Sequence, residues 1–171
     1  MDGYLLDTNA ASVLWDKRHR EHTTIRGFLQ MFANGPTWIS VVVLGEIEYG
    51  LKIVPQMDED RQNEVRRQMA RFPQVLDVNK HTIEPYSDLR AALFKAYSPR
   101  NSRGRLKMKW PEDLHERTSA KELGIQENDL WIAAQAIQYN LVLITDDHMH
   151  RLQEASTTLD YPLQLASWKF P

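Results

Sequence analysis

Cysteine is absent from all 171 residues of this chain, which excludes disulfide bonds and thiolate metal ligands and fits a reducing compartment. Long apolar runs are absent too. The longest runs, such as 41–44 and 130–134, have four or five residues, against the roughly 20 needed to span a bilayer. No basic segment followed by an apolar stretch opens the chain, so we expect no secretory signal, no membrane association and a cytoplasmic location.

The composition is that of a soluble globular protein, with 42% hydrophobic and 26% charged residues. A chain of this length buries roughly 70% of the surface that its unfolded form exposes, so one core can stabilise it without metal or disulfide crosslinks. We therefore expect a single domain over residues 1–171. Any metal ligands in it would serve function rather than folding.

Charge is distributed unevenly along the chain. The formal net charge is −2, but residues 98–111 contain five basic residues and no acidic one, which leaves −7 on the rest. A polyanion would therefore have to be bound by this stretch. Its basic residues are Arg100, Arg103, Arg105, Lys107 and Lys109.

Short apolar segments alternate with amphipathic ones. The apolar segments predict strands at 4–6, 38–41, 75–76, 141–144 and 161–165. The amphipathic or charged segments predict helices at 12–20, 23–33, 42–50, 58–71, 81–97 and 129–139, with residues 34–36 ending the second and Asn128 capping the last. This alternation predicts an α/β three-layer sandwich with a mainly parallel central sheet, in which residues 98–116 form an insertion.

Acidic residues lie where these strands and helices meet. Asp7 follows the first strand, and Asp146 and Asp147 follow the strand at 141–144. Glu46 and Asp129 lie near the starts of helices. Because parallel strands end at one edge of a sheet, we expect four acidic positions to converge there. Mg²⁺ or Mn²⁺ would relieve their repulsion, since these ions take oxygen ligands, and such a site implies phosphoryl-ester chemistry.

Each acid also has a purely structural interpretation. Asp7 and Asp129 could cap the helices that follow them, and Asp146 or Asp147 could begin a turn. Glu46 is flanked by apolar residues, so it needs a charged partner or a metal to remain ionised. The sequence alone leaves both interpretations open.

Four short segments occur in a specific order. They are Leu-Leu-Asp-Thr-Asn at 5–9, Ile-Ser-Val at 39–41 followed by Glu46 and Tyr-Gly at 49–50, Glu-Asn-Asp-Leu-Trp-Ile-Ala-Ala at 127–134, and Leu-Ile-Thr-Asp-Asp at 143–147. In this order and spacing the chain resembles the PIN-domain ribonucleases, and more narrowly the VapC-type toxins of bacterial toxin–antitoxin pairs. The resemblance covers nearly the whole chain except roughly residues 98–116.

The resemblance implies a Mg²⁺- or Mn²⁺-dependent endoribonuclease, a hydrolase of RNA phosphodiester bonds that acts as a toxin. Four carboxylates would be catalytic and hold the metal, with Asp146 as a further candidate ligand: Asp7, Glu46, Asp129 and Asp147. Three polar residues would orient them by hydrogen bonds: Asn9, Ser40 and Thr145.

The same resemblance implies protein partners and an RNA substrate. We expect an antitoxin protein, which lies across the acidic edge, and a homodimer. Four apolar residues are candidate walls for the antitoxin groove, although core packing explains them equally well: Leu14, Trp15, Ile47 and Leu51. We expect the five basic residues of 98–111 to contact the RNA backbone. Trp110 would either stack on an unpaired base or anchor the stretch by packing.

Other functions stay open on the sequence alone. A zinc site or a metal-free histidine ribonuclease could use His19, His22, His148 and His150. A haloacid-dehalogenase-like phosphatase would use Asp7 as nucleophile, although that family has an aspartate at the position of Asn9. The third alternative is a non-catalytic PIN-like domain that binds RNA or protein.

Overall fold

Five parallel strands form the centre of the molecule. The computed structural model describes residues 2–32, 35–54, 58–116, 118–119, 121–147 and 149–169. Its strands are β1 (Tyr4–Leu6), β2 (Thr37–Ser40), β3 (Val75–Leu76), β4 (Val142–Ile144) and β5 (Gln164–Ala166). They form one sheet in the order β3-β2-β1-β4-β5, and every neighbouring pair is parallel. The predicted α/β class with a parallel sheet is confirmed.

The strand order fixes where a ligand site can form. The chain moves outward from β1 to β2 and β3, then returns to place β4 on the other side of β1. Leu6 at the end of β1 pairs with Ile39 of β2 and Ile144 of β4, so the three strands end level with one another. The order reverses between β1 and β4, and side chains that follow these strands meet at that edge.

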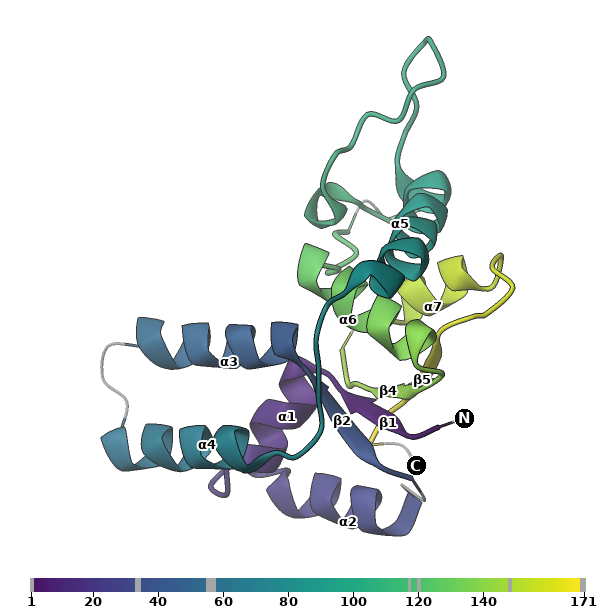
Figure 1. Ribbon diagram of the computed structural model, residues 1–171. Helices are drawn as coiled ribbons and strands as arrows, with labels where there is room; N and C mark the ends of the chain where they lie inside the picture. The colour runs from purple at the N-terminus through teal and green to yellow at the C-terminus, as the bar shows by residue number, and fades with distance from the viewer. Residues whose placement is uncertain are drawn as a thin grey trace.

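Helices cover both faces of the sheet. Figure 1 shows α1 and α2 on one side of the strands and α5, α6 and α7 on the other. The helices are α1 (Thr8–Trp15), α2 (His22–Phe32), α3 (Val41–Ile53), α4 (Glu59–Arg71), α5 (Ile83–Tyr97) after the 3-10 turn η1 (Lys80–Thr82), α6 (Glu127–Gln138) and α7 (His150–Ser156). Among the described residues no helix has the length and apolar character needed to cross a membrane.

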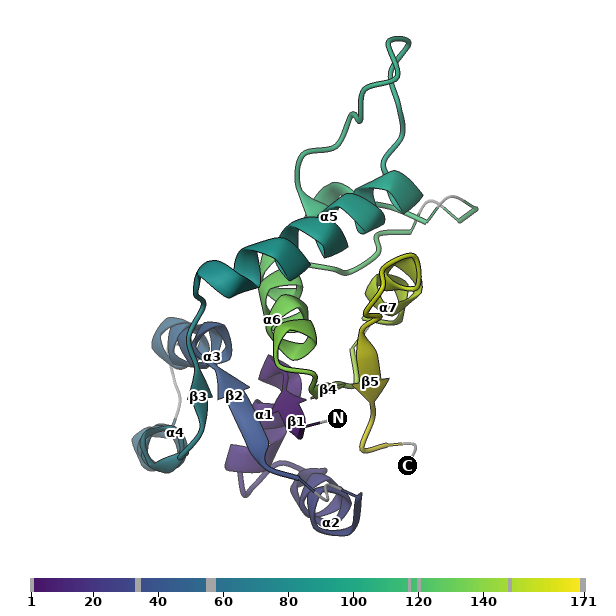
Figure 2. The ribbon, with the colours of Figure 1, turned by 45° about the vertical axis from the view of Figure 1, so that its right-hand side comes forward.

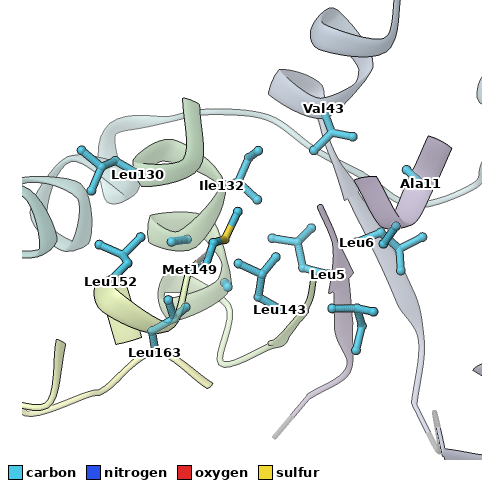
Figure 3. Close-up of a cluster of buried hydrophobic side chains, with 14 of the residues drawn as sticks. Leu5, Leu6, Ala11, Val43, Leu130, Ile132, Leu143, Met149, Leu152 and Leu163 are labelled. Carbon is cyan, nitrogen blue, oxygen red and sulfur yellow. The ribbon is translucent and has the colours of Figure 1, made fainter. Parts of the chain in front are cut away.

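The core lies between the sheet and the helices on each face. Leu5, Leu6 and Leu143 are fully buried, as expected for central strands with both faces covered. Figure 3 shows Leu5 and Leu143 beside Ile132 of α6 and Met149, which lies just before α7, and Leu6 on the opposite side of its strand near Ala11 of α1. Met149 also lines the pocket at the carboxyl edge, so the core reaches that pocket directly.

Several predicted helix boundaries were wrong. The first helix begins at Thr8 rather than Ser12, because the Asp7 side chain accepts a hydrogen bond from Ala10 N–H and caps it at once. Its end at Trp15 precedes the predicted end by five residues, since residues 16–21 form turns. The cap of α6 is Gln126 and not Asn128. The helix α7 was not predicted, and Asn34 lies outside the described residues.

Residues 98–109 form an arm beyond the end of α5. Figures 1 and 2 show this arm, drawn in teal and green, projecting away from the sheet and returning toward α6. A single antiparallel bridge joins Arg100 to Leu106 across it. The 3-10 turn η2 (Pro111–Asp113) follows its returning side. The inserted character predicted for 98–116 fits this shape.

One glycine at the start of β1 allows a close approach that another residue would prevent. Gly3 has φ +147°, and a Cβ there would lie 2.4 Å from the carbonyl oxygen of Pro36. That oxygen accepts the N–H of Tyr4 and so joins β1 to the start of β2. Gly3 therefore allows β1, the strand that leads to Asp7, to lie close to the start of β2.

We predict that Gly3→Ala lowers the free energy of unfolding by about 1–3 kcal/mol, the range for strained backbone positions. Gly27→Ala is the matched control, because a Cβ at Gly27 in α2 meets nothing within 4 Å. That control should stabilise by about 0.5–1 kcal/mol through helix propensity. Urea denaturation followed by circular dichroism measures both, and equal effects of the two variants would contradict this role of Gly3.

Candidate acidic active site at the carboxyl edge of the sheet

The structure brings the four predicted carboxylates to one pocket. A pocket of about 270 Å³ is lined by Asp7, Glu46, Asp129 and Asp147 together with Thr8, Asn9, Ser12, Gly124, Gln126 and Met149. Asp7 follows β1 and Asp147 follows β4, while Glu46 lies in α3 and Asp129 in the first turn of α6. The pocket therefore lies at the edge where the strand order reverses.

Asp7 has both of the roles that the sequence left open. It caps α1 by accepting the N–H of Ala10 at 2.6 Å, and its side chain also lines the acidic pocket while being only 2% exposed. Its pKa is raised to about 6, mainly by burial and to a smaller extent by the charges of Asp147 and Asp146, while hydrogen bonds from Thr145 and Ala10 act to lower it.

Glu46 is held by two polar side chains that sequence reasoning did not assign to it. The Thr8 hydroxyl donates to Glu46 Oε2, and the Asn128 amide donates to Glu46 Oε1 at 2.8 Å. These bonds link α1, α3 and the first turn of α6. Their positions next to predicted site residues are the sequence feature that could have indicated this role, since Thr8 follows Asp7 and Asn128 precedes Asp129. From its sequence position alone, Asn128 is predicted to be a helix cap.

Asp129 combines a capping contact with a place in the pocket. Its Oδ2 accepts the N–H of Gln126 at 2.7 Å, which completes a capping box at the start of α6. Burial raises the pKa of Asp129 to about 7, and the nearby charges of Glu46, Asp147 and Asp7 act in the same direction. The contributions of Glu46, Asp147 and Asp7 reflect the mutual repulsion of these carboxylates.

The two aspartates after β4 differ in their surroundings. Asp147 lines the pocket, and its N–H donates to the Thr145 hydroxyl at 3.0 Å. Asp146 instead forms an ion pair with Lys169 and accepts from the Ser167 hydroxyl at 3.4 Å. Because Lys169 already neutralises Asp146, the geometry favours Asp147 as the fourth pocket carboxylate.

The three predicted orienting residues have different positions. Thr145 is buried and bonds to the Asp7 carboxylate as well as to the N–H of Asp147, so it joins one carboxylate to the backbone that carries another. Asn9 is exposed and lines the pocket. Ser40 is fully buried, and its hydroxyl accepts the N–H of Val42 at 3.0 Å as the cap of α3. Ser40 thus positions the helix that carries Glu46.

The basic residues predicted to bind RNA lie on the arm and not in the acidic pocket. All five are exposed: Arg100, Arg103, Arg105, Lys107 and Lys109. Arg100 donates to the carbonyl of Gly104 at 2.7 Å and lines a separate cavity of about 660 Å³ at the base of the arm. Asn101 accepts the N–H groups of Arg103 and Arg105, which shapes the tip.

The histidines make local hydrogen bonds. His19 accepts the N–H of Glu21 at 3.2 Å, and a ring nitrogen of His22 lies 3.4 Å from the carbonyl of Val13. His150 begins α7 and is exposed. His148 lies outside the described residues, so the predicted pair of His148 and His150 is not tested.

The pocket has the donor atoms that a hard divalent cation prefers, namely carboxylate oxygens. As the side chains stand, no three Asp, Glu, His or Cys residues of the described segments are grouped to hold an ion. The oxygens of Asp7, Asp129 and Glu46 are turned toward hydrogen-bond donors instead. The raised pKa values of Asp7 and Asp129 indicate unrelieved burial and repulsion, which a cation would relieve. The residues therefore fit Mg²⁺ or Mn²⁺ in chemistry, with some side-chain rotation needed.

A parallel α/β fold with carboxylates gathered at the carboxyl edge of its sheet defines the class of this protein. A family model described as "PIN domain" matches residues 4–154. The chain belongs to the PIN domain family. No curated protein matches it in sequence.

Solved structures with a similar fold include toxin–antitoxin complexes. VapBC2 from Rickettsia felis, bound to a DNA fragment from its promoter, has a TM-score of 0.62 at 21% identity and covers 96% of this chain and 98% of that chain. VapBC-1 from nontypeable Haemophilus influenzae has a TM-score of 0.60 at 22% identity, covering 97% and 98%. FitAcB from Neisseria gonorrhoeae has a TM-score of 0.63 at 16% identity, covering 98% and 99%. These likenesses show a shared fold.

The raised pKa values predict a pH-dependent stability in the presence of EDTA. Asp7 and Asp129 keep their protons in the folded state up to about pH 6 and 7, whereas the unfolded chain releases them near 3.8. Their stabilising contribution is therefore complete below about pH 4 and is lost as pH rises through 6 and 7. We expect the free energy of unfolding to fall by about 1–3 kcal/mol between pH 5 and 8.

The double variant Asp7→Asn, Asp129→Asn should be more stable than the parent at pH 8 and should lose much less stability between pH 5 and 8. Asparagine at residue 7 can still cap α1, so the helix start is preserved. Asp160→Asn is the control, since Asp160 is exposed and lies before the amino end of β5. Urea denaturation in EDTA at both pH values tests this, and parallel pH curves for parent and double variant would refute it.

Proposed function

We propose that this chain is a metal-dependent endoribonuclease and the toxin of a bacterial toxin–antitoxin pair that acts in the cytoplasm. The observation that carries the proposal is the convergence of Asp7, Glu46, Asp129 and Asp147 on one pocket. Membership of the PIN domain family supports nuclease chemistry, and the fold shared with VapBC structures supports the toxin assignment.

The chain's own residues would prepare this pocket for a cation and an RNA phosphate. Asp7, Glu46, Asp129 and Asp147 would hold Mg²⁺ or Mn²⁺, and that ion, when bound, would activate water and neutralise phosphate charge. Thr145 would fix Asp7 and the chain at Asp147 relative to each other. Thr8 and Asn128 would hold the Glu46 carboxylate from its two sides.

RNA would reach this acidic pocket with help from the arm. A pocket of carboxylates repels phosphate, and the chain outside 98–111 carries −7. The arm concentrates positive charge, because its five basic residues are all exposed and no acidic residue lies among them. They would attract the RNA backbone and orient it, while the carboxylates and their ion act on one phosphodiester.

An apolar groove beside the acidic pocket supports the proposed antitoxin partner. The groove, of about 450 Å³, lies between α1, α3 and α4, and Val13, Ile47, Leu51, Val54 and Val65 contribute its apolar lining. Thr8, Asn9, Ser12 and Glu46 line both the groove and the pocket. A helical segment in the groove would place a basic side chain near the carboxylates and block RNA.

Two of the four predicted groove residues line the groove, and one belongs to the core. Ile47 and Leu51 face it. Trp15 is 4% exposed and contacts Phe72 edge to face at 5.7 Å, so of its two interpretations, groove wall and core packing, the structure supports core packing. Leu14 is partly buried against the core. We also propose a homodimer, and its basis is the resemblance of the sequence to VapC-type toxins.

The alternative functions have less support. The PIN domain match and Asn9 both argue against a haloacid-dehalogenase-like phosphatase. A non-catalytic PIN-like domain would not need four carboxylates in one pocket, with two pKa values raised by burial and repulsion.

We predict RNA cleavage that requires Mg²⁺ or Mn²⁺ and stops in EDTA. Asp7→Asn, Asp129→Asn and Asp147→Asn should each lower the cleavage rate at least about 100-fold, since each removes a charged oxygen from the proposed site. Asp146→Asn should lower the rate far less, because Lys169 pairs with Asp146. Gel assays with total RNA measure these rates, and full activity in EDTA would disprove the proposal.

We predict that replacing Arg100, Arg103 and Arg105 with alanine weakens RNA binding regardless of sequence. The logarithmic salt dependence of binding should flatten by up to roughly 0.7 per lost phosphate contact. The matched control replaces Arg26, Arg71 and Lys80, exposed basic residues outside the arm, and changes the net charge equally. If both triple variants behave alike, net charge and not the arm attracts RNA.

We predict that expression of the chain alone arrests growth and that a co-expressed antitoxin relieves the arrest. Val54→Asp should prevent that relief, because it places a charge in the apolar groove at a residue that is 44% exposed and outside the core. Ile53→Asp is the control, since exposed Ile53 does not line the groove. Normal growth while soluble, intact protein accumulates would contradict the toxin assignment.

A further inference from the structure

Trp110 presents a large aromatic surface to solvent. It is 59% exposed, whereas Trp15 and Trp168 are 4% and 1% exposed and Trp38 and Trp131 are partly buried. The sequence left open whether Trp110 anchors the arm by packing, and this exposure argues against that. An exposed indole lacks the large favourable free energy that its burial would contribute, so a binding role is the better explanation.

The backbone that carries this indole is held in place on both sides. Arg90 of α5 donates to the carbonyl of Lys109 at 2.7 Å. On the other side the carbonyl of Trp110 accepts the N–H of Asp113 at 3.2 Å, and Pro111 is buried. The exposed ring is thus mounted on a fixed backbone at the end of the arm.

Arg90 connects this point to the helix that carries Asp129. Its guanidinium pairs with Glu127 and donates to the Tyr86 hydroxyl at 2.7 Å. The Tyr86 ring stacks on Trp131 of α6, with ring centres 3.8 Å apart. Arg90 therefore holds together the end of the arm, α5 and the first turn of α6.

A second contact ties the same turn to the chain just after Trp110. Glu112 Oε1 accepts the N–H of Glu127 at 2.8 Å. Glu127 precedes Asp129 by two residues, and Glu112 follows Trp110 by two. Chain geometry then limits the path between the Cα atoms of Trp110 and Asp129 to roughly 25 Å. A single RNA strand a few nucleotides long can cover that distance.

We propose that Trp110 is a stacking site for an unpaired nucleobase of the RNA strand that enters the acidic pocket. This rests on the proposed ribonuclease function and adds a contact to it. The occupant is argued from charge: the residues before Trp110 on the arm contain five basic side chains and no acid, which suits a phosphate backbone. A cationic track with an aromatic ring is the usual arrangement for binding single strands.

The chemistry of stacking determines what the site can recognise. Every nucleobase has a flat aromatic face, so Trp110 would increase affinity for unpaired RNA without selecting one base. A base in a double helix is already stacked and is not free to bind. The site would therefore favour loops and single strands over duplexes.

The test is RNA binding in EDTA by the Asp7→Asn protein, using a fluorescein-labelled oligoadenylate that is not cut. Trp110→Ala should weaken binding about 5- to 100-fold, the range for loss of one stacked base. Trp110→Phe should restore most of the affinity, and Tyr161→Ala, which truncates an exposed aromatic residue before the amino end of β5, should not change it. Thermal melting checks that each variant is folded.

Tryptophan fluorescence separates stacking from a general structural effect. Unlabelled oligoadenylate should quench part of the emission of the Asp7→Asn protein, and Trp110→Phe should abolish that quenching while RNA still binds. Unchanged affinity in Trp110→Ala, or quenching that persists in Trp110→Phe, would overturn the stacking site. RNA cleavage by the parent protein with Mn²⁺ is measured separately. If the parent protein does not cleave RNA, the nuclease proposal fails, yet an affinity loss in Trp110→Ala would still support the stacking site.

Discussion

The structure depends on the repulsion among four carboxylates at one pocket, of which Asp7 is buried, Glu46 and Asp129 are partly buried and Asp147 is exposed. Among the described residues, Asp7, Glu46, Asp129 and Asp147 line one pocket, and no described basic side chain lines it with them. Holding such groups together costs folding free energy whenever they are charged, as the raised pKa values of Asp7 and Asp129 indicate. A protein that only needed stability would not retain this arrangement, so the pocket is best explained by an ion and a substrate that use it.

The rest of the fold opposes that repulsion. The N–H of Asp7 donates to the carbonyl of Ile144 at 3.1 Å, which joins the ends of β1 and β4 at the edge of the pocket. Asp7 caps α1 and Asp129 lies in the first turn of α6, so the hydrogen bonds that start these two helices hold the acids in place. The buried strands and Met149 support the pocket on the side that faces the core. Lys169 neutralises Asp146 and thereby keeps one more charge out of the pocket.

Much of this arrangement could be predicted from the sequence, because it follows from local rules. Short apolar runs ending in Asp7 and Asp147 predict strand ends at one edge, and parallel pairing brings them together. Side-chain partners across helices could not be predicted, since the bonds of Thr8 and Asn128 to Glu46 depend on how α1, α3 and α6 pack. The burial of Trp15 could not be predicted either, because an apolar residue on a helix suits a groove as well as a core. Nor could the hydrogen bond from Arg90 to the carbonyl of Lys109, which joins α5 to the end of the arm.

Direct measurement of Mn²⁺ binding tests most simply whether the carboxylates form a cation site. Electron paramagnetic resonance detects free Mn²⁺, so its signal falls when the protein binds the ion. We expect the parent protein to bind Mn²⁺, Asp7→Asn and Asp129→Asn to bind it at least about tenfold more weakly, and Asp160→Asn to bind it like the parent. Equal Mn²⁺ binding by the parent and both pocket variants, or none by the parent, would contradict a cation site at these residues.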